Sequence, residues 1–373
     1  MLTSAQLAAL DHVTAYADKR RTEALERLAG VPDVAELIAN VRAHGRVTLN
    51  FHPDRLLADG RTVAESMAAD GRYRSQFETG VTNGSRTAFL GGFRDRWEQA
   101  LFGTAYHGPD VLPAERPLYG GLNLLAHPDG ASPRFGSCHV RLRPEVSARS
   151  TFTVGDSHLG PADVGTLEAF ECVLAGLVEQ ARETGVTLGR AGVDPLAMLR
   201  GLADHVPSRE PGRALDDYLE AQVHGPVDLA ADAEALVLDP SFRDTPSGDL
   251  LTELAARCGI ALEWHAGFEL HPARFGPDFR GPEAPRFAAH VVERFGDGRW
   301  WLDAELVGRA AAAAARDPLA WSSWGTEDEV LQLVKYLWHT LVHAGGPTAS
   351  APDIGLPGRS PDAAGTAGPE LRL

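Results

Sequence analysis

Cysteine and lysine are scarce in this chain of 373 residues, and no long apolar run is present. The three cysteines, Cys138, Cys172 and Cys258, lie far apart beside apolar neighbours, so they build neither a disulfide framework nor a CxxC zinc pattern. Small core thiols of this kind are typical of a reducing compartment. No apolar stretch approaches the roughly 20 residues that cross a bilayer, and the N-terminus has no secretory signal pattern. We therefore expect a soluble cytoplasmic protein without a membrane partner.

Positive charge is also limited. The sequence has 35 Lys+Arg residues against 51 Asp+Glu residues, a formal net charge of −16, and Lys19 and Lys335 are its only lysines. Proteins that coat or track nucleic acid need a basic face, so this balance argues against such a role. It leaves room for one anionic ligand held by a local group of arginines, whose planar guanidinium groups suit phosphates. The natural candidates surround one loop-rich segment: Arg55, Arg72, Arg74 and Arg86.

The signature motifs of several enzyme classes are absent as well. The sequence contains no GxxxxGK[ST], GxSxG or HExxH motif and no GxGxxG after a predicted strand. His265 and His271 in WHAGFELH come nearest to a metal-binding pair, but the extended chain between them separates the rings too far for one ion. We therefore predict no metal site and keep a metal-dependent hydrolase only as an alternative.

The pattern of elements indicates an α+β fold, because short strands alternate with isolated helices without a regular βαβ rhythm. Strands are predicted over 46–52, 118–126, 134–144, 149–157, 216–229 and 233–241, and a helix over 166–184.

Composition divides the chain into four parts. We expect a helical lead-in over 1–44, the main domain over 45–250, a mostly helical part packed on it over 251–345, and a disordered tail over 346–373.

Polar side chains gather near the ends of four predicted strands. They are His52 with Arg55, Tyr119 with Asn123, the run Ser150–Thr153, and Glu220 with Gln222 and His224. One such run is typical of a solvated strand face. Four runs favour a cleft that several strands build together.

The same regions contain six longer phrases: RYRSQFETGVTNGSRTAF, GGFRDRWEQALFGTAYHG, ERPLYGGLNLL, DGASPRFGSCHVRLRP, RSTFTVGDS and LDDYLEAQVHGPVDL. Together they resemble a bacterial domain-of-unknown-function family, number 3626, over about residues 40 to 285. By pattern, that family is similar to mono-ADP-ribosyltransferases, in which one strand offers Arg or His, a second a Ser/Thr-rich or aromatic signature, and a third the catalytic Glu. Here His52 or Arg55 matches the first, RSTFT the second, and Glu220 or Gln222 the third.

The resemblance implies a split antiparallel β-sandwich of ADP-ribosyltransferase type with flanking helices. It also implies that NAD is the co-substrate and that ADP-ribose passes to a protein or nucleic-acid acceptor. Cleavage of the nicotinamide–ribose bond develops positive charge on the ribose, which a carboxylate stabilises. Glu220, with Gln222 beside it, is implied for that catalytic role.

Further residues are implied in binding NAD. His52 or Arg55 would orient its ribose or diphosphate, an aromatic ring would stack on nicotinamide, and hydroxyl groups would brace the site. Glu78, on a glycine-flanked loop, is the reserve carboxylate. The full set is His52, Arg55, Ser150, Thr151, Thr153, Tyr73, Phe77, Glu78, Asn83 and Tyr119.

One feature departs from the transferase pattern. Arginine-modifying transferases carry Glu or Gln, a spacer and then the catalytic Glu, whereas the order here is Glu220, Ala221, Gln222. A displacement by two residues keeps the same strand face but moves the carboxylate by roughly 6 to 7 Å. An NAD glycohydrolase, a non-catalytic ligand-binding module and a metal-dependent hydrolase therefore stay open as alternatives, and each polar residue above has a purely structural role as its competing interpretation.

Overall fold

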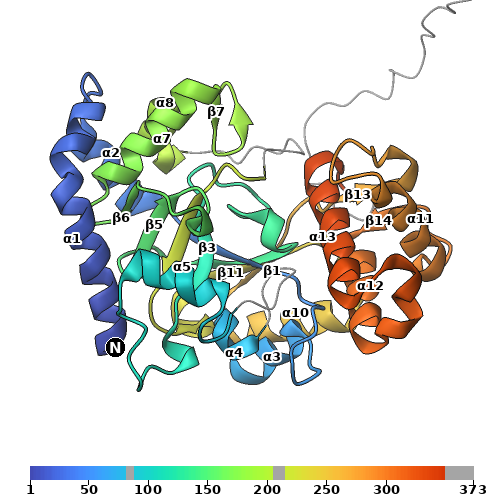
Figure 1. Ribbon diagram of the computed structural model, residues 1–373. Coiled ribbons are helices and arrows are strands. Elements are labelled where there is room, and N and C mark those ends of the chain that lie inside the picture. The colour runs from blue at the N-terminus through green and yellow to red at the C-terminus, as the bar shows by residue number, and fades with distance from the viewer. Residues whose placement is uncertain (81–87, 205–214, 349–373) are drawn as a thin grey trace, which may run out of the picture.

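In the computed structural model, which describes residues 1–80, 88–204 and 215–348, a sheet of eight strands runs through the centre of the protein (Figure 1). The strands, in spatial order, are β12 (Ala261–Trp264), β11 (Ala233–Leu238), β4 (Cys138–Leu142), β1 (Val47–Phe51), β3 (Leu118–Leu122), β9 (Leu219–Val223), β5 (Ser150–Val154) and β6 (Val164–Thr166). Neighbours are antiparallel except β11 and β12, which are parallel. The expectation of an α+β fold is confirmed as a large, mostly antiparallel sheet with flanking helices.

The middle strand of this sheet is buried on both faces. All five residues of β1 are buried, so Thr48 and Asn50 are enclosed together with their apolar neighbours. Asn50 satisfies its side chain by donating to the carbonyl oxygens of Asp129 and Gly136 at 2.9 and 3.2 Å. Buried amides need such partners, so these bonds fix the loops beside the strand.

The N-terminal helices cover one end of the sheet. They are α1 (Ser4–Arg27) and α2 (Val34–His44), and α1 packs on β6 and on α7 (Glu171–Thr184). A capping box between Thr3 and Gln6 starts α1. Arg27 near its end forms ion pairs with Asp163 and Glu179 at 2.7 and 2.6 Å. The helical lead-in is therefore packed against the edge of the sheet.

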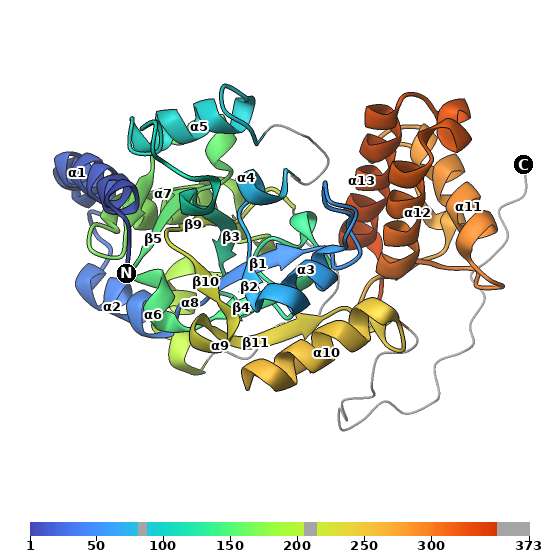
Figure 2. The same ribbon diagram turned by 90° about the horizontal axis from the view of Figure 1, so that it is seen from below.

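A group of C-terminal helices stands at the other end (Figure 2). It consists of α11 (Glu283–Phe295), α12 (Ala304–Arg316) and α13 (Glu327–Ala344), which pack on one another. Trp338 of α13 donates its indole N–H to the carbonyl oxygen of Pro133 at 2.8 Å and so ties this group to the sheet. Between the two parts, α10 (Pro246–Cys258) packs on β11, β12 and α3 (Val63–Asp70).

Shorter elements fill the connections. They are β2 (Arg72–Tyr73), α4 (Gln76–Thr79), α5 (Phe93–Phe102), η1 (Pro113–Glu115), η2 (Pro133–Phe135), α6 (Pro144–Ser147), η3 (Ser157–Leu159), β7 (Val186–Thr187), β8 (Arg190–Ala191), α8 (Pro195–Arg200), η4 (Leu202–Asp204), β10 (Val227–Asp228), α9 (Leu229–Asp232), η5 (Pro240–Phe242), β13 (Glu269–Leu270), η6 (Pro272–Arg274), β14 (Leu302–Asp303) and η7 (Pro318–Trp324).

The loop after β1 is wedged between the sheet and the C-terminal helices. Asp54 in this loop packs against Gly308 of α12 so closely that a Cβ on the glycine would lie 1.4 Å from a carboxylate oxygen. Both Asp54 oxygens are buried and make no hydrogen bond to the described part of the chain. Burial raises the pKa of Asp54 to about 7. Its neighbours His52 and Arg55 line a small gap shared with α12 and α13.

The C-terminal tail predicted over 346–373 is described only as far as residue 348, and the rest of it lies outside the described residues.

The prediction that no segment crosses a membrane can be compared with the described helices. No helix within the three described ranges has the length and apolar character needed to cross a membrane.

Candidate functional site

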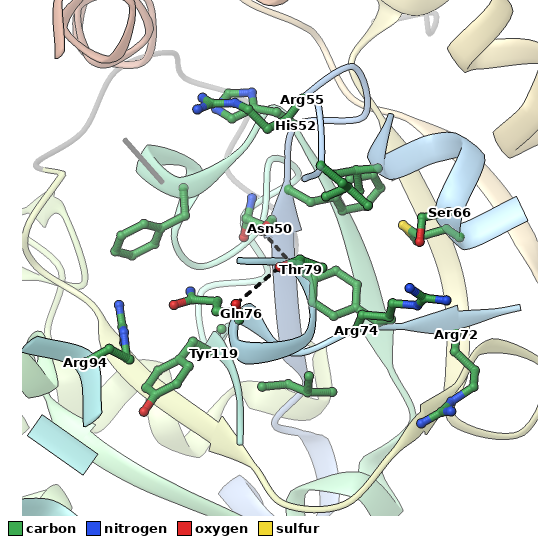
Figure 3. A pocket seen from close by; sticks show the side chains of 18 of the residues that line it. Asn50, His52, Arg55, Ser66, Arg72, Arg74, Gln76, Thr79, Arg94 and Tyr119 are labelled. Carbon is green, nitrogen blue, oxygen red and sulfur yellow. Dashed lines mark hydrogen bonds between the residues drawn. The ribbon is translucent and has the colours of Figure 1, made fainter. Parts of the chain in front are cut away.

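A cavity lies between the sheet and the segment from α3 to α5 (Figure 3). Strands β1, β3 and β9 form one wall, and α3, β2, α4 and α5 supply the others. The volume of the cavity is about 130 Å³. Its polar lining consists of Asn50, His52, Arg55, Ser66, Arg72, Tyr73, Arg74, Gln76, Thr79, Arg94, Tyr119, Asp156 and Glu220.

Glu220 lies in the sheet wall of this cavity and is 3% exposed. One carboxylate oxygen accepts a hydrogen bond from the Gln222 amide at 2.8 Å, and the other accepts from the backbone N–H of Ser157 at 3.4 Å. Burial raises the pKa of Glu220 to about 7, and the nearby Asp156 carboxylate adds to the rise. At neutral pH the group is therefore divided between its protonated and ionised forms, which is the state that acid–base catalysis needs.

Four arginines surround the cavity. They are Arg55, Arg72, Arg74 and Arg94, and Figure 3 shows them on different sides of it. Among the described residues that line the cavity, Glu220 and Asp156 are the only carboxylic acids, and Arg74 also pairs with Asp70 just outside. This part of a strongly acidic protein is therefore locally basic, as a site for an anionic ligand must be.

A buried network of ion pairs supports one side of the cavity. Arg116, 3% exposed, binds the carboxylates of Glu98 and Asp95, each at 2.7 Å. The Tyr119 hydroxyl donates to the other oxygen of Glu98 at 2.9 Å. The guanidinium carbon of Arg94 lies 4.3 Å from the centre of the Tyr119 ring, and the buried Nε of Arg94 has no hydrogen-bond partner among the described residues. The network thus fixes the Tyr119 ring against which the Arg94 guanidinium packs.

The histidine of the cavity is neutral at physiological pH. Burial lowers the pKa of His52 well below its usual value, and the charge of Arg55 adds to that effect. Its ring packs edge-on against Trp338 of α13, with 5.0 Å between the ring centres. The Tyr73 hydroxyl donates to the backbone carbonyl of Asn50 at 3.2 Å. Neutral His52 can donate a hydrogen bond to a ligand or accept one from it, but it supplies no charge.

The structure brings five of the predicted site residues together around the cavity: His52, Arg55, Tyr73, Tyr119 and Glu220. Among the cavity residues that the sequence analysis did not name, two are charged, Arg94 and Asp156. Arg94 falls three residues before Trp97 and four before Glu98 in RDRWEQALF, so helical spacing puts all three near one face of α5. Asp156 begins the short helix η3 directly after β5.

Asp156 keeps its charge although it is largely enclosed. Burial acts to raise the pKa of Asp156, but hydrogen bonds with His158, including 2.6 Å to its ring Nδ1, outweigh burial and leave the pKa lowered. Environments that push the pKa values of Asp156 and Glu220 in opposite directions give the cavity one ionised carboxylate and one that titrates near neutrality.

The other predicted residues lie away from the cavity. Gln222 and Thr151 are fully buried next to Glu220 but outside the cavity lining, and the threonine hydroxyl donates to the glutamine side-chain oxygen at 2.7 Å. The Ser150 hydroxyl donates to the Val146 carbonyl oxygen at 3.0 Å, and the Thr153 hydroxyl donates to the Gly155 carbonyl oxygen at 2.8 Å.

Phe77, Glu78 and Asn83 also fall outside the cavity lining. The Phe77 ring lies under the Arg116 guanidinium, 4.3 Å from its carbon. Glu78 accepts the backbone N–H of Ser75 at 2.8 Å and closes the capping box of α4. Asn83 belongs to 81–87, outside the described residues.

The histidines considered as metal ligands have other partners. The His265 ring contacts the Ser137 carbonyl at 2.7 Å and accepts the Gly267 N–H at 2.9 Å, while His271 caps the short helix η6. Over the described ranges, no three His, Cys, Asp or Glu side chains are grouped so that they could hold a metal ion.

Comparison with known proteins gives matches of two kinds. The family model described as "Protein of unknown function (DUF3626)" matches residues 46–344. The "Gene 2 protein" of Mycobacterium phage L5 is 26% identical over 204 residues, which cover 52% of this chain and 66% of the phage protein. The "Gene 2 protein" of Mycobacterium phage D29 is 30% identical over 213 residues, which cover 53% of this chain and 68% of the phage protein. The chain therefore spans about two thirds of the length of these relatives.

Proposed function

The chain belongs to the family of proteins of unknown function DUF3626, and from that starting point we propose that it is an NAD-dependent mono-ADP-ribosyltransferase whose catalytic carboxylate is Glu220. The observation that carries the proposal is a buried glutamate in the wall of a cavity that four arginines surround. We further propose that the sheet corresponds to the split sandwich of ADP-ribosyltransferases.

The size and charge of the cavity suit NAD. An apolar cavity of about 150 Å³ accommodates a benzene ring. The 130 Å³ present here is of similar size, so it can take the six-membered ring of nicotinamide but not a whole dinucleotide. The rest of a dinucleotide must then lie along the rim, where one of the arginines Arg55, Arg72 and Arg94 can bind its diphosphate. The unsatisfied Nε of Arg94 is a donor that such a ligand would complete.

The chemistry of the bound dinucleotide defines what Glu220 must do. NAD supplies the nicotinamide–ribose bond, whose electron pair leaves with nicotinamide while a nucleophile of the acceptor bonds to C1′ and loses a proton. Ionised Glu220 stabilises the positive charge that develops on the ribose. Its pKa of about 7 also suits removal of the proton from the acceptor.

Nicotinamide release tests the proposal. The purified chain is incubated with NAD, with and without a bacterial lysate, and both free nicotinamide and ADP-ribose on macromolecules are measured. We expect equal amounts of the two when lysate is present. Release that needs no acceptor and labels none would identify an NAD glycohydrolase instead. If calorimetry detects no NAD binding and no nicotinamide appears, the proposal is refuted.

The rate of nicotinamide release is expected to rise with pH. Because the ionised form of Glu220 is the active one and its pKa is about 7, the rate should increase about tenfold per pH unit below about pH 6 and level off above about pH 8. A flat profile, or a rate that falls over this range, would contradict the role of the ionised carboxylate.

Protein stability must be controlled in that measurement. The folded state holds the Glu220 proton more tightly than the unfolded chain does, so this group stabilises the fold at low pH and loses that contribution as the pH rises through about 7. Rates are therefore compared at a temperature well below the melting temperature measured at each pH.

A further inference from the structure

Five buried side chains form a continuous hydrogen-bonded chain that ends on Glu220. The Tyr106 hydroxyl lies 2.5 Å from Nδ1 of His224, and Nε2 of the same ring lies 3.2 Å from the Thr151 hydroxyl. The Thr151 hydroxyl donates to Gln222 Oε1 at 2.7 Å, and Gln222 Nε2 donates to Glu220 Oε1 at 2.8 Å. Only the last member of this chain lines the cavity.

The chain is closed to solvent along its length. Tyr106 is 1% exposed, and Thr151, Gln222 and His224 are 0% exposed. Glu220, Gln222 and His224 are alternate residues of one extended segment, so their side chains point to the same side. Thr151 on β5 is paired in register with Gln222. Polar groups enclosed in this way must satisfy one another, so the direction of each bond constrains the next.

The chemistry of the groups permits only one direction when Glu220 is ionised. A carboxylate only accepts, so the amide nitrogen of Gln222 must face it and the amide oxygen must face Thr151. The Thr151 hydroxyl therefore donates to that oxygen and accepts the N–H of His224 Nε2. Burial lowers the pKa of His224 to about 3, so the ring carries a single proton and its Nδ1 accepts the Tyr106 hydroxyl.

We propose that Tyr106, His224 and Thr151 are positioning residues that orient the Gln222 amide so that its N–H faces Glu220. Without this chain the amide could turn its oxygen toward Glu220, and two facing oxygens tolerate each other only when the carboxyl group is protonated. The chain thereby favours the ionised form at neutral pH. The effect of these residues on the rate of nicotinamide release rests on the proposed function, whereas the positions of the protons along the hydrogen-bonded side chains do not.

Other groups also act on the two titrating members of the chain. Asp156, Arg94, Tyr119 and Tyr218 face Glu220, and Arg149 lies beside His224. None of them orients Gln222, since the hydrogen-bond partners of its side chain are Thr151 and Glu220. Removing the Thr151 hydroxyl therefore isolates the contribution of the chain.

The first test reads the proton of His224 directly in the wild-type chain. Nitrogen NMR of protein labelled at histidine is recorded between about pH 6 and pH 8, with the His224 signals assigned by their loss in His224→Gln. We expect a neutral ring protonated at Nε2 throughout that range. A ring protonated at Nδ1 would overturn the proposal. The measurement is made on the wild-type protein, and the His224→Gln variant serves only to assign the signals.

The second test follows the Glu220 carboxyl carbon by NMR in Thr151→Val and in a matched control, Thr166→Val. Thr166 is paired with Thr151 across the sheet and is also buried, but its hydroxyl contacts Thr14 at 3.1 Å and not the chain. We expect the titration midpoint of Glu220 to rise by roughly one pH unit in Thr151→Val, and to stay unchanged in Thr166→Val. An unchanged midpoint in both variants would overturn the proposal.

Rates of nicotinamide release separate this inference from the proposed function. A rise of roughly one pH unit leaves about one tenth of Glu220 ionised at pH 7 instead of about one half, so the rate should fall about fivefold and recover at higher pH. A shifted midpoint in a protein without activity would support the positioning chain and refute the transferase. An unshifted midpoint in an active enzyme would refute the chain alone.

Discussion

Replacement of Glu220 by glutamine is expected to lower the rate of nicotinamide release by about 10²- to 10³-fold. The substitution keeps the size of the side chain and an oxygen that can accept the Gln222 N–H at 2.8 Å, but it removes the negative charge. In the part of the chain that the structure describes, the other carboxylate of the cavity lining is Asp156, which is already bound to His158. The rate is measured at about pH 8, where the wild-type group is ionised.

A control for this substitution comes from an exposed glutamate. Glu253 is exposed on α10 and is not part of the cavity lining, so Glu253→Gln should keep the wild-type rate. The Glu220→Gln protein should melt no earlier than wild type at pH 8, because it no longer has to hold an ionised carboxylate in a buried site. A variant that folds and keeps more than about a tenth of the wild-type rate would show that Glu220 is not the catalytic carboxylate.

Replacement of Arg116 by methionine is expected to lower the free energy of unfolding by about 3 to 5 kcal/mol. The guanidinium binds Glu98 and Asp95 in a nearly inaccessible position, so its loss leaves two carboxylates without their cationic partner. Burial already raises the pKa of Glu98 to about 7 against the effect of Arg116. The pKa should rise further in the variant, so the deficit should grow as the pH increases. Urea unfolding at about pH 6 and about pH 8 measures both effects.

Two further variants identify the cause of that loss. Arg286→Met removes a solvent-exposed partner of Glu283, and we expect a change below about 0.5 kcal/mol. The double variant Arg116→Met with Glu98→Gln should recover part of the stability, because it removes one of the uncompensated charges. If Arg116→Met lowers the free energy of unfolding no more than Arg286→Met does, the buried ion pairs of Arg116 do not stabilise the fold.

The sequence pattern located elements best where local signals and tertiary packing agree. The strand predicted over 46–52 is observed as Val47–Phe51, because its β-branched and aromatic residues precede Pro53, which cannot extend a ladder. The helix predicted over 166–184 begins only at Glu171. Thr166 pairs with Thr151 and ends β6, and the chain turns before α7 starts. Apolar residues at helical spacing fit both arrangements, so pairing with a distant strand decided the outcome.

The sequence predicted the part of the candidate site that lies near the ends of strands. Polar residues near strand ends pointed to His52, Arg55, Tyr119 and Glu220, all of which line the cavity. Alternation along a strand tells which residues share a face but not whether that face is open, so Thr151 could not be recognised as fully enclosed. Arg94 was missed because a charged residue on a short helix is usually solvated.

The close approach of α12 to the loop after β1 shows that the cavity depends on the C-terminal helices as well as on the sheet. His52 and Arg55 lie on either side of Asp54, whose place against α12 requires a glycine at position 308. Helices about 250 residues further along the chain therefore help to set the shape of one cavity wall. The family match to residues 46–344 extends past the sheet and takes in all three C-terminal helices. Substitutions on the buried side of α12 and α13 can therefore change the shape of the cavity from outside it. A recombinant fragment that ends with the sheet would lack the helices that pack against His52 and Arg55.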